Sequence, residues 1–212
     1  MCGINGFILD SDQYNTELIT LMSNEIIHRG PDDEGYYNDI ITGKKISLGM
    51  RRLSIIDIDK GKQPIISDDG NLILVFNGEI YNYQSLKIEL ETNHNTEFNT
   101  NSDTEVILKM YEIYGVESFS KLDGMFAFSI LDKNIGKVFI ARDFFGEKPL
   151  YYSKQMERII WGSELKSLML NFESKPKINK EALSLYFQLT YIPAPYSIYD
   201  GVKKLLPNHY LE

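Results

Sequence analysis

The chain has 212 residues, of which 43% are hydrophobic and 25% charged, and its 30 acidic and 22 basic side chains give a net charge of −8. This composition is typical of a soluble globular domain and argues against a nucleic-acid partner, because phosphate binding needs a basic surface. No apolar run approaches the ~20 residues that cross a bilayer, and the N-terminus lacks the features of a signal peptide. We therefore expect a cytoplasmic protein without a membrane anchor. A single cysteine, Cys2, excludes an internal disulfide and a thiolate-rich zinc site.

The first part of the chain reads as short strands and one amphipathic helix. Apolar, β-compatible residues predict a strand at Gly3–Leu9, and apolar side chains at helical spacing predict a helix at Asn15–Ile27. The stretch His28–Gly35 contains two Gly and one Pro and is expected to be a loop. Two further strands are predicted at Ile46–Met50 and Leu53–Asp57.

The run Leu72–Phe76 is apolar throughout and predicts a strand buried on both faces. It is expected to stop at Asn77 and Gly78, because this dipeptide tolerates the positive φ of a turn. A helix follows at Tyr83–Leu90.

Ser102 and Glu105 fit a capping box, and the apolar stripe behind them predicts a helix that ends at Gly115. The pattern then returns to strands, predicted at Met125–Leu131, Lys137–Arg142, Leu150–Tyr152 and Arg158–Trp161. Short helices are expected at Glu164–Leu170 and Lys180–Leu189, before an extended tail that contains Pro.

These elements mix without a regular βαβ alternation, so a doubly wound parallel sheet fits poorly. Two strand-rich blocks with flanking helices instead predict an α+β fold with two packed antiparallel sheets. We expect one domain over residues 1–212.

Cys2 is a candidate nucleophile. If Met1 is removed, the thiol and a free α-amine lie on one residue, and an amine with a pKa near 8 can take the proton of a thiol with a pKa near 8.5. The alternative is a small buried side chain near the end of the chain. The other candidates are weaker, because the histidines follow no metal-ligand or triad spacing: His28, His94 and His209.

Nine motifs, in order along the chain, resemble the glutaminase domain of glutamine-dependent asparagine synthetases. They are Cys2–Ile4, His28–Asp33, Arg52–Asp57, Phe76–Asn82, Ser102–Glu105, Leu122–Phe128, Ala141–Gly146, Lys148–Tyr152 and Gly162–Lys166. The resemblance covers essentially the whole chain. It implies an N-terminal-nucleophile amidotransferase with a four-layer α/β/β/α sandwich (the Ntn-hydrolase fold).

The resemblance also implies catalytic roles. Cys2 is expected to attack the side-chain amide carbonyl of L-glutamine, with its α-amine as the base. The side-chain amide of Asn77 and the main-chain N–H of Gly78 are expected to stabilise the oxyanion. A plain Asn-Gly turn is the alternative for these two residues.

The amino-acid head group of glutamine needs a cation and an acid. Arg52 is expected to bind the α-carboxylate in a two-pronged manner, while Arg51 points to the other face of an extended segment. Asp103 and Glu79 are expected to hold the α-ammonium, although the helix dipole by itself favours an acid at residue 103. Main-chain groups complete the wall of the site, at Leu53, Ser54, Ile55 and Ile56. Other motif residues are expected to order the loop over the substrate: Arg29, Pro31 and Asp32.

A full asparagine synthetase also has an ATP-pyrophosphatase domain, and neither its Ser-Gly-Gly-x-Asp-Ser loop nor a P-loop occurs here. We expect no metal and no organic cofactor in this domain, with ATP and Mg²⁺ confined to a synthetase domain in cis. The chain is either an excised N-terminal half or a stand-alone glutaminase, and its strand-like end favours excision. Homodimer formation stays open.

Other functions were compared with this one. The acceptor of ammonia can be a sugar-linked carboxylate, as in the synthetase-like enzymes of polysaccharide assembly. Glucosamine-phosphate synthase and the purine amidotransferase share the nucleophile but differ in their motifs. A non-catalytic glutamine sensor or partner module belongs to a different class, and the presence of Cys2 argues against it.

Overall fold

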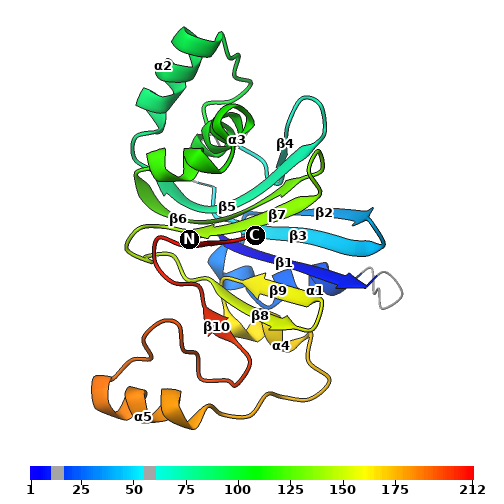
Figure 1. Cartoon of the computed structure of the whole chain (residues 1–212), viewed down its shortest axis with the longest axis vertical. Helices are drawn as coiled ribbons and strands as arrows, with labels where there is room; N and C mark the ends of the chain where they lie inside the picture. Colours follow the sequence, from blue (N-terminus) through cyan, green and yellow to red (C-terminus); the bar gives the residue numbers. More distant parts are fainter. Residues whose placement is uncertain (11–16, 55–60) are drawn as a thin grey trace.

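The structure is a computed structural model that describes residues 1–10, 17–54 and 61–212. Two antiparallel sheets pack face to face, and helices cover the outer face of each sheet (Figure 1). This arrangement confirms the expected α+β class and its α/β/β/α layers.

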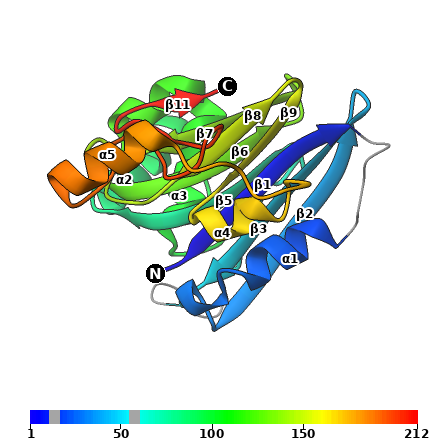
Figure 2. The ribbon, with the colours of Figure 1, turned by 90° about the horizontal axis from the view of Figure 1, so that it is seen from below.

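The first sheet has six strands in the order β10-β8-β9-β1-β3-β2. Their bounds are β1 Gly3–Asp10, β2 Asp33–Ile41, β3 Lys44–Arg52, β8 Tyr151–Gln155, β9 Arg158–Gly162 and β10 Lys203–Lys204. The N-terminal strand β1 lies between β3 and β9 and pairs antiparallel with both. Helices α1 (Leu18–Asn24) and α4 (Leu165–Met169) lie across the outer face of this sheet (Figure 2).

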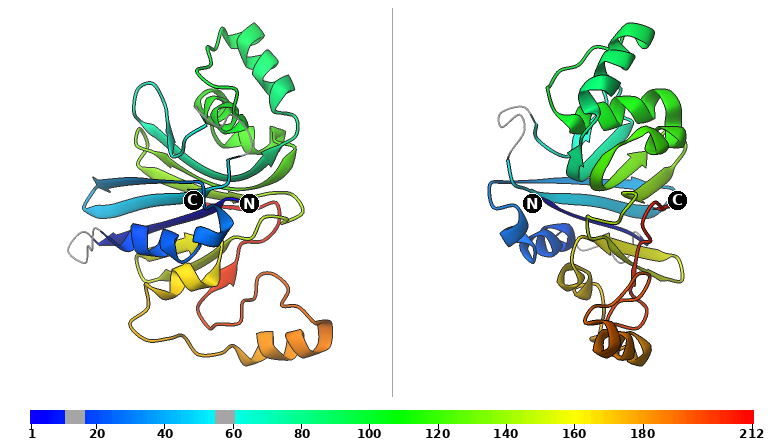
Figure 3. Two further views of the ribbon diagram at one scale, coloured as in Figure 1. Left: turned by 180° about the vertical axis from the view of Figure 1, so that it is seen from behind. Right: turned by 90° about the vertical axis from the view of Figure 1, so that its left-hand side faces the viewer.

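The second sheet has five strands in the order β11-β7-β6-β5-β4. Their bounds are β4 Ile65–Ile66, β5 Leu72–Ile80, β6 Gly124–Asp132, β7 Lys137–Arg142 and β11 Tyr210–Leu211. Helices α2 (Tyr83–His94) and α3 (Asp103–Tyr114) cover its outer face, opposite to α1 and α4 (Figure 3). Helix α5 (Lys180–Leu189) stands apart from the layers.

The core between the sheets is apolar. Ile4, Leu48, Ile73 and Trp161 are fully buried there. The indole N–H of Trp161 donates to the hydroxyl of Ser129 at 2.7 Å, which satisfies the buried ring nitrogen and links the two sheets. Burial of these side chains fixes how the sheets sit on each other, and therefore where the start of β1 lies relative to β5.

Strand β2 lies partly where the sequence predicts a loop. Among the described strands it lies at the edge of the sheet and pairs with β3 alone, and its residues are half-buried or exposed. Because one face and one edge of β2 meet solvent, its sequence has no apolar run to mark it. The predicted loop His28–Gly35 therefore divides into three parts. Its first two residues end the 3-10 turn Ile27–Arg29, Gly30–Asp32 has loop geometry, and Asp33 begins β2.

Strand β5 is longer than predicted. Asn77 and Gly78 pair with Ala127 and Phe126 of β6, so the prediction that they end the strand in a turn is wrong. Glycine is needed at this position for a different reason, because a Cβ on Gly78 would lie 2.2 Å from the main-chain oxygen of Met125. The close approach of two strands, rather than a turn, explains this glycine.

Ser102 is the N-cap of α3, as predicted, and its hydroxyl accepts from the N–H of Thr104 at 3.2 Å. The other half of the expected capping box is absent. The carboxylate of Glu105 instead accepts from the N–H groups of Asn99 and Thr100, at 2.9 and 2.7 Å. Glu105 therefore orders the loop before the helix.

Two predictions fall partly outside the described residues. Within the expected helix Asn15–Ile27, the residues of α1 (Leu18–Asn24) are helical and Ile27 begins a 3-10 turn, while the first two residues lie outside the described ranges. The first two residues of the expected strand Leu53–Asp57 are coil, and the other three lie outside the described ranges. The remaining predicted elements occur within a few residues of their expected positions. None of the described helices is both long and apolar enough to cross a membrane.

Candidate active site

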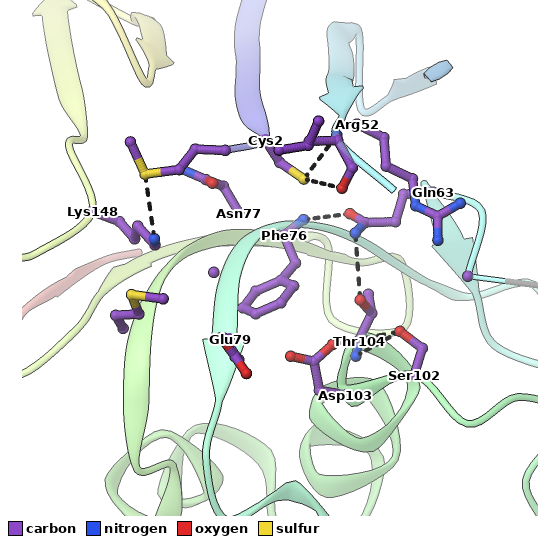
Figure 4. A pocket seen from close by; sticks show the side chains of 15 residues that line it. Cys2, Arg52, Gln63, Phe76, Asn77, Glu79, Ser102, Asp103, Thr104 and Lys148 are labelled. Carbon is purple, nitrogen blue, oxygen red and sulfur yellow. Dashed lines mark hydrogen bonds between the residues drawn. The ribbon is translucent and has the colours of Figure 1, made fainter. Parts of the chain in front are cut away.

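Four segments meet at one pocket of about 120 Å³: the start of β1, the end of β3, the second half of β5 and the start of α3 (Figure 4). The pocket brings together seven predicted site residues that are far apart in the sequence. They are Cys2, Arg52, Leu53, Asn77, Gly78, Glu79 and Asp103.

The thiol of Cys2 is half-buried at the rim of this pocket and lies against the main chain of Leu53. The N–H of Leu53 points at Sγ at 3.4 Å, and the thiol faces the carbonyl oxygen of Leu53 at 3.7 Å. On the other side, Nε of Arg29 donates to the carbonyl oxygen of Cys2 at 2.9 Å. The main chain of Leu53 and the side chain of Arg29 therefore fix the position of Cys2 at the edge of the pocket.

One edge of β5 presents main-chain N–H groups to the pocket. Alternate residues of a strand point their N–H groups to the same side, so Phe76, Gly78 and Ile80 share this edge. The N–H of Phe76 donates to Oε1 of Gln63 at 2.7 Å, and that of Ile80 donates to Oδ2 of Asp103 at 3.1 Å. The N–H of Gly78 lies between them and faces the pocket, beyond the end of the short neighbouring strand β4.

The side chain of Asn77 supplies a second donor. It is 1% exposed, and its Nδ2 has no hydrogen-bond partner among the residues that the structure describes. An unpaired buried donor costs about 1–3 kcal/mol, so its presence beside a pocket marks a position where a ligand oxygen can bind. Asn77 Nδ2 and the Gly78 N–H are therefore two fixed donors next to a thiol, the arrangement that an oxyanion requires.

Two carboxylates line the opposite part of the pocket. Asp103, the first residue of α3, is 4% exposed, and Glu79 is its neighbour on β5. Burial raises the pKa of Asp103, hydrogen bonds from the N–H groups of Ile80 and Thr104 lower it, and the negative charge of Glu79 raises it again. A bound cation would offset the energetic cost of burying the Asp103 carboxylate and would reduce the repulsion between the two acids.

Arg52 and Arg51 leave β3 on opposite faces, as expected for an extended segment. Arg52 is buried and lines the pocket. The guanidinium of Arg51 instead pairs with Glu34, bonds to the side chain of Asn24 and donates to the carbonyl oxygen of Ser23 at 3.3 Å. Of these two arginines, Arg52 is the one placed to meet a carboxylate in the pocket.

Three predicted wall residues are not placed there. Ser54 does not line the pocket, and its N–H donates to Oδ2 of Asp32 at 2.9 Å. Ile55 and Ile56 lie outside the described residues. The bond from Ser54, with that from the Asp32 N–H to the carbonyl oxygen of Arg52 at 3.1 Å, ties the end of β3 to the loop before β2.

Gln63 and Lys148 line the pocket although neither had a predicted role from the sequence. Gln63 is buried and connects β5 to α3, because it accepts from Phe76 and donates to Oγ1 of Thr104 at 3.4 Å. It lies outside all nine motifs, so no sequence signal marked it. Lys148 opens the motif Lys148–Tyr152, yet only the fold shows that its buried side chain reaches the pocket.

The histidines bond to nearby polar groups. His28 pairs with Glu164 at 2.8 Å, His94 bonds to the hydroxyl of Tyr114 at 2.9 Å, and His209 bonds to the carbonyl oxygen of Pro207. Within the described ranges, no group of three or more His, Cys, Asp and Glu side chains is arranged to hold a metal ion.

The amino-acid sequence is similar to those of known asparagine synthetases. The chain is 44% identical over 211 residues to asparagine synthetase (glutamine-hydrolyzing) 1 of Bacillus subtilis, a match that covers 98% of this chain and 32% of that protein. It is 43% identical over 222 residues to the putative asparagine synthetase (glutamine-hydrolyzing) 2 of Methanocaldococcus jannaschii, covering 97% and 42%. The chain therefore spans less than half the length of these relatives.

Solved structures agree on the fold. The structure of the allosteric regulatory enzyme of purine biosynthesis matches 80% of this chain and 43% of its own, with a TM-score of 0.67 at 22% identity. Glutamine phosphoribosylpyrophosphate amidotransferase from B. subtilis matches 79% of this chain and 43% of its own, with a TM-score of 0.61 at 23% identity. A family model described as a glutamine amidotransferase domain matches residues 1–212. The chain therefore belongs to the glutamine amidotransferase domain family.

Proposed function

We propose that this chain is the glutaminase domain of an asparagine synthetase, in which Cys2 hydrolyses the side-chain amide of L-glutamine. The ammonia would pass to an ATP-activated aspartate held by a synthetase domain of the same protein. One observation carries the proposal: a thiol shares its pocket with two donors suited to an oxyanion, Asn77 Nδ2 and the Gly78 N–H. The printed names of the relatives, glutamine-hydrolyzing asparagine synthetases, support the choice of acceptor.

The head group of glutamine fits the charged walls of the pocket. Arg52 binds the α-carboxylate, because a guanidinium can donate two parallel hydrogen bonds. Asp103 and Glu79 hold the α-ammonium, which removes the repulsion between their carboxylates. The main chain of Leu53 lies between this charged region and the thiol of Cys2. Bound in this way, the side chain of glutamine extends toward the sulfur.

The first half of the reaction breaks the C–N bond. After removal of Met1, the α-amine of Cys2 takes the thiol proton, and the thiolate attacks the amide carbon. Negative charge develops on the amide oxygen, which accepts hydrogen bonds from Asn77 and Gly78. The amine then gives its proton to the leaving nitrogen, ammonia departs, and a γ-glutamyl thioester remains.

The second half restores the enzyme. Water loses a proton to the α-amine of Cys2 and attacks the thioester carbon, with the oxyanion held by the same two donors. Collapse of this intermediate breaks the C–S bond and releases glutamate, and the proton returns to the thiol. No step uses a metal or an organic cofactor, so we assign ATP and Mg²⁺ to the synthetase domain.

The test is glutamate and ammonia release by protein whose N-terminus has been checked by intact mass. We expect loss of Met1, steady glutamine hydrolysis by the wild type, and no hydrolysis by Cys2→Ala. A folded Cys2→Ala variant that still binds glutamine would separate loss of chemistry from loss of the site. An active enzyme that retains Met1, or glutamine binding without any hydrolysis by the wild type, would contradict the proposal.

A further inference from the structure

Lys148 is a buried cation in the wall of the pocket. It is 4% exposed, and Figure 4 shows Lys148 and Arg52 on opposite sides of Cys2. Its Nζ donates to the thioether sulfur of Met1 at 3.5 Å, which is a weak acceptor. Among the residues that the structure describes, no carboxylate forms an ion pair with it. A buried ammonium with so poor a partner is unusual, because burial of a charge is costly unless the charge is paired.

The main chain holds this lysine in place. Its N–H donates to Oδ2 of Asp143 at 3.0 Å, and its carbonyl oxygen accepts from Nε of Arg142 at 2.7 Å. Asp143 is fully buried and also accepts from the N–H groups of Phe145 and Glu147, so the loop after β7 is fixed around one carboxylate. These hydrogen bonds fix the main chain at Lys148 and so place its side chain in the wall of the pocket.

Removal of Met1, on which the proposed function rests, changes the surroundings of Lys148. The thioether leaves, and the α-amine of Cys2 becomes the chain end on the same side of the pocket. A fixed positive charge disfavours the protonated form of a neighbouring amine and favours a neighbouring thiolate. Both effects increase the fraction of Cys2 in which the amine is a free base and the sulfur can react.

We propose that Lys148 is a positioning residue for the nucleophile, whose charge keeps the α-amine of Cys2 unprotonated and its thiol easily ionised near neutral pH. Lys148 acts on the reaction through Cys2.

Other charged groups lie around Cys2, some of them in the lining of the pocket and two of them outside it. They are Arg29 and Glu164 beside the Cys2 carbonyl, Arg52 on β3, Glu79 on β5 and Asp103 on α3. The two carboxylates on β5 and α3 favour a protonated amine and so oppose Lys148, until a substrate ammonium neutralises them. Arg29 is paired with Glu164 at 3.1 Å. Lys148, by contrast, forms no ion pair with any residue that the structure describes.

The test compares Lys148→Met and Lys148→Gln, which remove the charge, with Lys148→Arg, which keeps it. The rate of Cys2 alkylation by iodoacetamide and kcat/KM for glutamine are each measured against pH in the processed full chain. We expect the acidic limb of both profiles to move to higher pH by about one unit in the uncharged variants, because a nearby positive charge has been removed. At pH 7 alkylation slows by up to about tenfold, and Lys148→Arg stays close to the wild type.

Lys109→Met is the matched control. Lys109 is also a buried lysine, but it pairs with Asp68 at 2.8 Å and with Glu112 at 3.2 Å, away from the pocket. We expect its profile to be unchanged. A uniform loss of rate without a shift of the limb, or equal shifts in Lys148→Arg and Lys148→Met, would overturn the proposal. Alkylation reports on Cys2 whether or not glutamine is hydrolysed, so failure of the proposed function is seen separately, as absent Cys2-dependent hydrolysis in the wild type.

Discussion

Arg29 holds the main chain of Cys2: its Nε donates to the carbonyl oxygen of Cys2 at 2.9 Å, and its Nη1 bonds to Glu164 at 3.1 Å. The nucleophile is therefore fixed by its main chain on one side and by the N–H of Leu53 on the other. A residue at the end of a chain is otherwise free to move.

The first prediction concerns this contact. Arg29→Ala should lower kcat for glutamine hydrolysis by about 10- to 100-fold, because a small displacement of the attacking atom is enough for such a loss. KM should change little, since Arg29 does not line the pocket. The measurement is steady-state glutaminase kinetics. Glu164→Gln retains the bond from Arg29 to Cys2 and should lose much less; an equal loss would point to general disruption of this region.

The second prediction concerns the unpaired amide of Asn77. Asn77→Ala should lower kcat by about 10²–10³ with little change in KM, because this donor acts on charge that develops only in the transition state. The measurement is again glutaminase kinetics, with thermal unfolding as the control for folding. The buried Nδ2 has no partner among the described residues, so its removal relieves an unsatisfied group and should not lower the melting temperature greatly. A normal kcat would contradict the oxyanion assignment.

The third prediction concerns pH. Burial and the charge of Glu79 raise the pKa of Asp103, so this carboxylate is lost as the pH falls through a value above that of an ordinary Asp. The KM for glutamine should therefore rise in mild acid, because protonated Asp103 no longer attracts the α-ammonium. The measurement is KM against pH below neutrality.

Two variants sharpen this third prediction. Asp103→Asn should have a raised KM at neutral pH and should lose the pH dependence. Glu79→Gln should move the dependence to lower pH, because the group that raises the pKa of Asp103 is gone. An identical KM profile in the wild type and Asp103→Asn would remove the head-group role of this residue.

The fourth prediction concerns Gln63, which accepts from the Phe76 N–H and donates to Thr104. Gln63→Leu leaves a buried main-chain donor unsatisfied and should lower the free energy of unfolding by about 1–3 kcal/mol. Gln63→Glu keeps the acceptor toward Phe76 and should be less destabilising. Urea unfolding of both variants decides the matter, and equal stability of Gln63→Leu and the wild type would show that the bond contributes nothing.

Much of the fold follows from local sequence patterns. Strand β7 and helix α5 have the predicted bounds, and α3 begins at its Ser102 cap and ends before Gly115, as expected. These elements are marked by hydrophobic periodicity and by end signals that act within a few residues. The family resemblance rests on the same kind of information, because its motifs are contiguous stretches of chain.

Other features depended on residues distant in the sequence. Strand β2 forms by pairing with the edge of β3. Asn77 and Gly78 stay in β5 because they pair with β6, and the close approach of β6 leaves no room for a side chain at residue 78. Glu105 bonds to the preceding loop rather than to its own helix end. In each case a tertiary contact decides between local conformations of similar energy.

The amino-acid sequence by itself indicated the family, because its motifs are contiguous stretches of chain, and the resemblance then pointed to Cys2, Asn77 and Asp103. The single cysteine excluded an internal disulfide and a thiolate-rich zinc site. Only the tertiary structure decided that these residues share one pocket, that the Gly78 N–H faces it, and that Lys148 is buried beside Cys2. The reason is physical: charge, burial and the direction of a donor belong to the space around a residue, and packing of the two sheets creates that space.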